Sequence, residues 1–324
     1  MSLPTLPAHH LAERPQQRRW LIDELWGDEA VGIVGGEPKC CKSFLALDMA
    51  VAVAGGVPCL RRFPTAHPGR VLLFAAEDAP HIVRQRLAGI AAAAGRDLAD
   101  LDIHVITAPS VRLDVERDRD ALAETIAALE PKLLVLDPFV RLHRIDENLA
   151  GEVAPLLAYL RELQRRHHLA VVLVHHARKG GAKMRAGQAL RGSSEFHAWG
   201  DSNLYLRRHG EQLSLSVEHR AAAAISAVSL HLAIDGDMVA LAANDRRLAE
   251  PARPSEATTV TVAIAAPTVE QTIAAHLATA TAPLTAEALR TLCRIRNATL
   301  TTALTALVIA GRVRKDPTGY VLAR

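Results

Sequence analysis

The sequence predicts an α/β fold with a mainly parallel sheet, followed by a small second domain. Short runs that are apolar almost throughout alternate with helix-like stretches. Strands buried on both faces of a parallel sheet have this composition, and regular alternation with helices is typical of right-handed crossovers. The alternation of strands and helices ends near residue 203, and a linker-like segment begins after residue 244.

The predicted elements alternate from Val31 onwards. Strands are expected at residues 31–34, 70–76, 132–137 and 169–176, and helices at 43–54, 82–94, 119–129 and 153–166. From about residue 203, strands follow one another with short turns, which predicts an antiparallel meander appended to the parallel sheet. Residues 1–26 are polar with scattered prolines and predict an N-terminal extension, so that residues 27–244 form the main domain.

The C-terminal part has a different composition. Residues 245–267 are rich in Pro, Ala and Thr, which predicts a linker. Residues 268–324 contain three helical segments and a short hairpin with its turn at Asp316–Gly319, a pattern that resembles a winged helix. Seven basic and three acidic residues favour an anionic partner, with duplex DNA the expected one. A solvated basic face and a protein–protein module are the alternatives.

The segment GEPKCCKS at residues 36–43 follows an apolar strand and precedes a helix, which is the setting of a Walker A phosphate loop. In such a loop, backbone N–H groups surround the β-phosphate of ATP. Lys42 is expected to bridge the β- and γ-phosphates, and the Ser43 hydroxyl to ligate Mg²⁺. The predicted nucleotide-binding residues are Gly36, Glu37, Pro38, Lys39, Cys40, Cys41, Lys42, Ser43, Phe44 and Asp137.

Cys41 departs from the Walker A pattern, which has glycine immediately before the lysine. A Cβ at this position crowds the phosphates and restricts the backbone. A small side chain is tolerable if Cys41 keeps right-handed helical dihedral angles. We therefore expect ATP binding to persist and the rate of hydrolysis to be the affected quantity. A degenerate, inactive loop is the alternative.

Polar residues end three further predicted strands. Asp137 has the position of a Walker B acid that holds Mg²⁺. Glu77 is the candidate general base for the attacking water, and the alternative, an acid at a helix N-terminus, fits Asp78 better. The pair His175 and His176 can hydrogen-bond the γ-phosphate and report its loss, unless it is an ordinary polar strand end.

A glycine- and lysine-rich stretch, KGGAKMRAGQA, follows these histidines. A flexible basic loop at the carboxyl edge of a sheet suits contact with single-stranded DNA in the pore of a ring. Arg191 comes directly after this stretch and is the candidate arginine finger for the γ-phosphate of a neighbouring subunit.

Together these motifs resemble the RepA-type hexameric replicative helicases of broad-host-range plasmids, within the RecA/DnaB superfamily of P-loop ATPases. The resemblance covers roughly residues 27–245, and its most specific parts are GEPKCCKSFLALDMAVAVAGG, LLFAAEDAPHIVRQRL, LLVLDPFVRLHRIDENLAG and VHHARKGG with LRGSS. It implies a RecA-like P-loop NTPase core and a homo-oligomer, a hexamer, with active sites between subunits. It assigns ATP and Mg²⁺ to Lys42 and Ser43, the base to Glu77, Walker B to Asp137, the sensor to His176 and the finger in trans to Arg191. It also places Arg141 and His143 on a carboxyl-edge loop as secondary contacts.

Composition excludes several other classes. The chain is 49% hydrophobic, which excludes a wholly disordered protein. It lacks an uninterrupted apolar run of about 18 residues, which argues against a membrane span. Its N-terminus lacks the apolar core of a secretory signal, and its four cysteines lack zinc-type spacing. The expected compartment is a reducing cytoplasm.

The leading functional hypothesis is an ATP-driven DNA motor, a RepA-like replicative helicase of a plasmid or mobile element. One alternative is a DNA-binding ATPase that does not unwind and serves as an accessory factor in recombination or replication. The other is a nucleotide-gated transcriptional regulator. The joint presence of Glu77, Asp137 and Arg191 favours a hydrolysing machine over a passive binder.

Overall fold

The computed structural model divides into two compact units, Met1–Ala252 and Arg253–Arg324, which are described separately. It describes residues 3–11, 19–176, 195–210, 212–223, 225–236, 238–244, 269–280, 283–293, 300–301, 303–304, 307–308, 312–316 and 318–323. The predicted linker at 245–267, the glycine- and lysine-rich stretch and Arg191 lie outside these residues. In the described residues, no helix combines the length and the apolar character that crossing a membrane requires.

The first unit is built around a nine-stranded sheet with the order β11-β10-β9-β8-β3-β7-β6-β4-β5. The six strands β3 to β8 pair with one another in parallel. From β8 onwards the chain continues as an antiparallel meander, in which β8 pairs with β9, β9 with β10 and β10 with β11. The strands are β3 (Val31–Gly36), β4 (Val71–Ala75), β5 (Ile103–Val105), β6 (Leu133–Asp137), β7 (Ala170–His176), β8 (Ser202–His209), β9 (Gln212–His219), β10 (Val228–Asp235) and β11 (Met238–Ala243).

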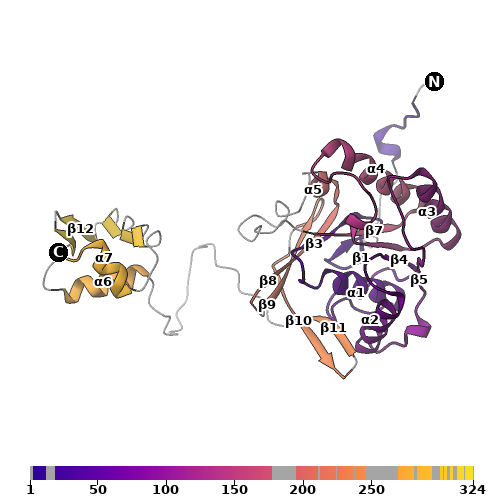
Figure 1. Ribbon diagram of the computed structural model, residues 1–324. Coiled ribbons are helices and arrows are strands. Elements are labelled where there is room, and N and C mark those ends of the chain that lie inside the picture. Colours follow the sequence, from indigo (N-terminus) through magenta and orange to yellow (C-terminus); the bar gives the residue numbers. More distant parts are fainter. Residues whose placement is uncertain are drawn as a thin grey trace. The chain divides into compact units, whose positions relative to one another are not determined.

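Helices cover both faces of this sheet (Figure 1). One face packs against α1 (Lys42–Gly55) and α2 (Pro80–Ala93). The other packs against α3 (Glu116–Leu129), α4 (Ala150–His167) and α5 (Glu195–Trp199). The alternating side chains of β7 show this division, since Val172 and Val174 face α1 whereas Val171 and Leu173 face the opposite layer.

The predicted α/β fold with a mainly parallel sheet is confirmed. The four predicted strands and four predicted helices are all present, with bounds shifted by no more than three residues. The predicted meander is present as β8–β11. The sequence analysis missed β5, which is short and mostly exposed, and α5, which has only five residues.

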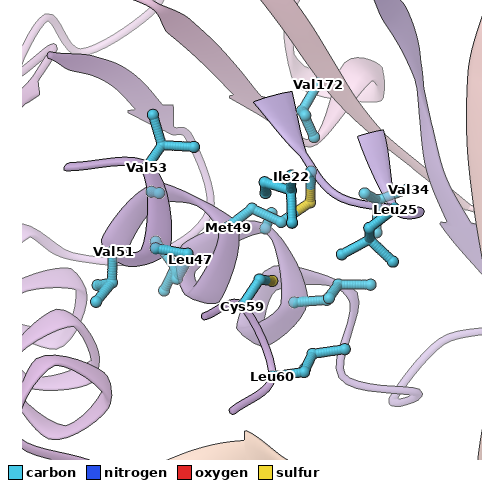
Figure 2. Packing of buried hydrophobic residues seen from close by; sticks show 14 of the residues in the cluster. Ile22, Leu25, Val34, Leu47, Met49, Val51, Val53, Cys59, Leu60 and Val172 are labelled. Carbon is cyan, nitrogen blue, oxygen red and sulfur yellow. The ribbon is translucent and has the colours of Figure 1, made fainter. Parts of the chain in front are cut away.

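The sequence predicts that the main domain starts at residue 27, but its core begins earlier in the chain. Strands β1 (Trp20–Ile22) and β2 (Trp26–Gly27) pair with each other, and Leu21, Ile22, Leu25 and Trp26 are fully buried in the cluster that contains α1. Figure 2 shows Ile22 and Leu25 among residues of this cluster, including Met49 and Val34. The predicted extension at 1–26 is therefore too long, because its last residues are part of the core.

The second unit contains α6 (Val269–Thr279), α7 (Ala286–Cys293) and a hairpin of β12 (Val313–Asp316) and β13 (Gly319–Leu322). Leu300, Leu304 and Leu307 are helical and lie with Ile273 and Leu289 in a core of its own. Asp316 pairs with Gly319, so the hairpin turn is where the sequence predicts it. Its assignment as a winged helix stays a prediction.

Candidate nucleotide-binding site

The candidate site lies at the carboxyl edge of the parallel strands. Gly36 at the end of β3 is in register with His176 at the end of β7, and Ala75 at the end of β4 is in register with Asp137 at the end of β6. Because parallel strands present their carboxyl ends at one edge, the residues that follow them converge there. This edge gathers the phosphate loop, Glu77, Asp137 and His176.

The phosphate loop folds around the amine of Lys42. Lys42 is the first residue of α1 and only 5% exposed, and its Nζ donates a hydrogen bond to the carbonyl oxygen of Glu37 at 2.8 Å. Burial lowers the pKa of Lys42, an effect opposed by the nearby Cys40, Asp137 and Glu77. Gly36 makes this close fold possible, since a Cβ there would lie 2.6 Å from the Cys40 Sγ and 2.4 Å from the Leu206 oxygen.

Cys41 has a left-handed backbone, with φ 64° and ψ 29°. Right-handed helical angles, the condition under which a small side chain at this position was expected to be tolerable, are therefore not met. The loop must reverse direction immediately before α1, and Lys39, with φ 64°, contributes to the same reversal. Left-handed residues alternating with right-handed ones aim successive N–H groups into one concavity, which is the geometry of an anion-binding nest. For a residue with a Cβ, this conformation costs about 1–2 kcal/mol.

The side chains of Ser43 and Asp137 meet beside the loop. Asp137 is 8% exposed and accepts a hydrogen bond from Ser43. Burial, followed by the neighbouring Asp78 and Glu77, raises the pKa of Asp137 to about 6, although Ser43 and Lys42 oppose the shift. A cavity of about 200 Å³ lies here, lined by Ser43, Ala75, Glu77, Asp78, Arg86 and Asp137.

This donor set fits Mg²⁺. Burial first, and then the carboxylates of Asp78 and Glu77, raise the pKa of Asp137, and a divalent cation would stabilise its ionised form. The described residues contain no group of three His, Cys, Asp or Glu arranged as a closed metal site. Proteins commonly hold Mg²⁺ through one or two oxygen ligands, with water and substrate phosphates completing the octahedron, and Ser43 and Asp137 would supply two such oxygens.

The two acids after β4 each pair with an arginine. The Nε of Arg141 donates to Glu77 Oε1 at 3.1 Å. Arg86, on α2, pairs with Asp78, and its guanidinium lies over the ring of Phe44, 5.3 Å from the centroid. Asp78 therefore has a partner within the helix that it precedes, while Glu77 faces the edge loop.

His176 and His175 lie on opposite faces of the sheet. His175 is buried and stacked on Phe196, with 4.3 Å between ring centroids, so it belongs to the core on the side of α4 and α5. Alternation along β7 places His176 on the face of α1 and the phosphate loop, where its side chain is partly exposed. His143 is also buried, 3.4 Å from Glu147 between Nε2 and Oε1, so only Arg141 of the two expected secondary contacts reaches the site.

The sequence analysis missed Arg208. Strand β8 runs parallel to β3, and near its end the Nη2 of Arg208 donates to Cys41 Sγ at 3.5 Å. A second cation therefore borders the phosphate loop. The signal in the sequence is the pair Arg207–Arg208 at a strand end, which is recognisable only once β8 is known to lie beside β3.

The chain is similar to one protein family and to several solved structures. Residues 1–182 match a protein-family model described as an AAA domain. A DnaB-like replicative helicase, solved in a study of its interactions with primase, has a TM-score of 0.51 at 14% identity, covering 66% of this chain and 57% of that chain. The RadB recombinase has a TM-score of 0.48 at 16% identity, with 66% of this chain and 90% of that chain covered.

A KaiC-like protein from Pyrococcus horikoshii OT3 has a TM-score of 0.46 at 14% identity, with 68% of this chain and 93% of that chain covered.

The chain spans little more than half the length of the DnaB-like helicase, and its likeness to that helicase shows the fold alone. The family model, by contrast, matches more than half of this chain. The chain belongs to the AAA-domain family and has the RecA-like α/β fold of P-loop ATPases.

Proposed function

We propose that this protein hydrolyses ATP and uses the energy to act on DNA as a ring-shaped motor of the RepA type. The observation that carries the proposal is the convergence of Ser43, Glu77 and Asp137 on one small cavity at the carboxyl edge of the sheet, with the Lys42 amine close enough to interact electrostatically with both carboxylates. These groups come from three separate strand ends, and a phosphate loop with a carboxylate pair is the arrangement that phosphoryl transfer requires.

In the proposed reaction, each group has one task. The Lys42 ammonium binds the β- and γ-phosphate oxygens, and the N–H groups at the start of α1 add their dipoles, since no side chain caps them. Ser43 and Asp137 hold Mg²⁺, which supplies Lewis-acid stabilisation of the phosphate charge when bound. Glu77 accepts the proton of the attacking water. His176 donates to the γ-phosphate from the neighbouring strand.

The DNA and ring parts of the proposal have separate support. The edge loop after β6 adjoins the nucleotide site, because its Arg141 hydrogen-bonds Glu77, so DNA held there would contact the site directly. Arg191 supplies the finger in trans, which requires a homo-oligomer, a hexamer in our proposal. The second unit presents exposed Arg314 and Lys315 on its hairpin, which suit the backbone of duplex DNA. A DNA-binding ATPase that does not unwind is the second candidate.

The proposed chemistry is tested by Lys42→Ala. We expect hydrolysis of ATP to fall to background, because the terminal phosphates lose the charge that holds them. Lys132→Ala, which changes a lysine before β6 far from the loop, should retain the wild-type rate. Equal turnover in Lys42→Ala and wild type would remove the phosphate-loop assignment.

Unwinding and assembly are tested on the wild-type chain. Strand separation of a forked duplex in the presence of ATP supports the helicase, and ATP hydrolysis without strand separation supports the second candidate. Native mass measured with ATP and Mg²⁺ gives the ring size. A monomer under these conditions would contradict an active site shared between subunits.

A further inference from the structure

The two carboxylates after β4 are neutralised by arginines from different elements. Arg86 belongs to α2 and pairs with Asp78, eight residues before it. Arg141 ends the short helix η4 (Phe139–Arg141), directly after β6, and pairs with Glu77 across 64 positions of the chain. The Glu77 pair therefore joins the carboxyl ends of two neighbouring strands, whereas the Asp78 pair is local.

The two pairs also differ in exposure. The side chains of Arg141 and Glu77 are 61% and 44% exposed, while those of Arg86 and Asp78 are 29% and 28% exposed. The guanidinium of Arg86 also lies over the ring of Phe44, and among the described residues no aromatic ring lies under the guanidinium of Arg141 in this way. An exposed ion pair contributes at most about 1 kcal/mol, so Arg141 can leave Glu77 for a better anion at little cost.

The contact engages one carboxylate oxygen of Glu77 in a hydrogen bond with the guanidinium and holds the group towards the edge loop, so this oxygen is not free to accept from a water molecule. A phosphodiester is the stronger partner for Arg141, since the planar guanidinium matches two phosphate oxygens at once and binding releases counterions from the nucleic acid. Arg141 lies on the edge loop between β6 and α4, where the exposed Val140 and Leu149 also face solvent. The guanidinium can thus be reached by a strand that passes over this edge.

We propose that Arg141 is a positioning residue that restrains Glu77 until a backbone phosphate of single-stranded DNA takes its guanidinium. The inference rests on the proposed function, in which Glu77 activates the attacking water. Transfer of Arg141 from carboxylate to phosphate frees Glu77 and so couples DNA binding to hydrolysis. Asp78 stays paired with Arg86 throughout and does not compete for the water.

The test measures ATP hydrolysis by the full chain, with and without a thymidine oligonucleotide. Arg141→Ala should raise kcat without DNA by about fivefold, the factor that corresponds to roughly 1 kcal/mol. The KM for ATP should not change, and the oligonucleotide should stimulate the variant much less than wild type. Arg141→Lys keeps a cation at this position and should restore the low rate without DNA. Arg144→Ala, an exposed arginine on the same loop, should leave the rate without DNA unchanged.

Three outcomes overturn the inference while the proposed function stands. They are an unchanged rate of Arg141→Ala without DNA, a fall in its kcat under both conditions, and a wild-type rate that the oligonucleotide does not stimulate. A wild-type protein with no more hydrolysis than Lys42→Ala would instead refute the proposed function, and the inference with it. Thermal unfolding of each variant shows that the fold is kept, which the exposure of Arg141 leads us to expect.

Discussion

Cys41 carries a Cβ on a left-handed backbone directly before the lysine of the phosphate loop. Its Sγ faces Arg208, and its partly buried side chain packs against the core that contains α1. The residue thus combines local strain with a side chain beside the place where phosphates would bind. Glycine at this position would remove both features, because it adopts positive φ without a steric penalty.

Cys41→Gly should raise the free energy of unfolding by about 1 kcal/mol, because the left-handed conformation then carries no Cβ. The same change should tighten ATP binding, since it removes the Cβ that crowds the phosphates. Urea unfolding and a nucleotide titration measure the two effects. Cys41→Ala is the matched control, as it removes the sulfur but keeps the Cβ, and it should show neither gain. Equal stabilisation in both variants would assign the effect to the thiol instead.

At the scale of elements, His219 at the end of β9 links the antiparallel meander to the strands β1 and β2. Its Nε2 donates to the carbonyl oxygen of Glu24, between β1 and β2, at 3.1 Å. Its Nδ1 lies 3.1 Å from the Oγ of Ser202 on β8, which also accepts from the Gly27 N–H. A neutral imidazole that donates at Nε2 accepts from the Ser202 hydroxyl at Nδ1. Burial lowers the pKa of His219 below its usual 6.5.

The sign of the resulting pH dependence follows from this lowered pKa. Below pH 6.5, the unfolded chain binds a proton at His219 that the folded chain does not bind, so the free energy of unfolding falls as the pH decreases. His219→Gln can keep polar contacts without titrating. We expect its stability to fall less than that of wild type between pH 7 and pH 5, measured by urea unfolding. An equal loss of unfolding free energy in wild type and His219→Gln over this pH range would show that His219 is not the group responsible.

The parallel strands and their helices were predictable because each is long and strongly patterned. The positions of Lys42, Ser43, Glu77, Asp137 and His176 at one edge of the sheet were predictable because each lies at the end of a strand or in the segment that follows it. The short elements were not predictable, since β1 and β2 have three and two residues and gain their burial from α1, far along the chain. The same holds for Arg208, whose relevance depends on β8 lying beside β3, and for the conformation of Cys41, which the loop imposes.

For the whole molecule, the division into two units predicts that each unit unfolds independently of the other. The core of the second unit includes Leu289, which is fully buried, whereas Leu292 on the same helix is 49% exposed. Leu289→Ala should destabilise that unit by about 3 kcal/mol, through lost burial and a cavity. ATP hydrolysis should stay at the wild-type rate, because the candidate site lies in Met1–Ala252.

Hydrogen exchange of the full chain, read peptide by peptide, measures this effect in each unit. Leu292→Ala is the matched control and should alter neither unit, since its side chain has little burial to lose. Faster exchange throughout β3, β6 and β7 in Leu289→Ala would contradict separable stability and show one cooperative body.

The place of β3 between β7 and β8 has a consequence for synthesis on the ribosome. The strand emerges early, but its N–H groups at Val31 and Ile33 reach partners 170 residues later, on Asp201 and Asn203. At about 5–20 residues per second, the nascent chain waits roughly 10–30 s for those partners to be translated. Strand β7 becomes available first, but the edge of β3 that pairs with β8 stays exposed for the whole interval. Newly made protein therefore presents an unpaired apolar strand edge, which favours aggregation, until residue 206 has left the exit tunnel and pairs with Gly36.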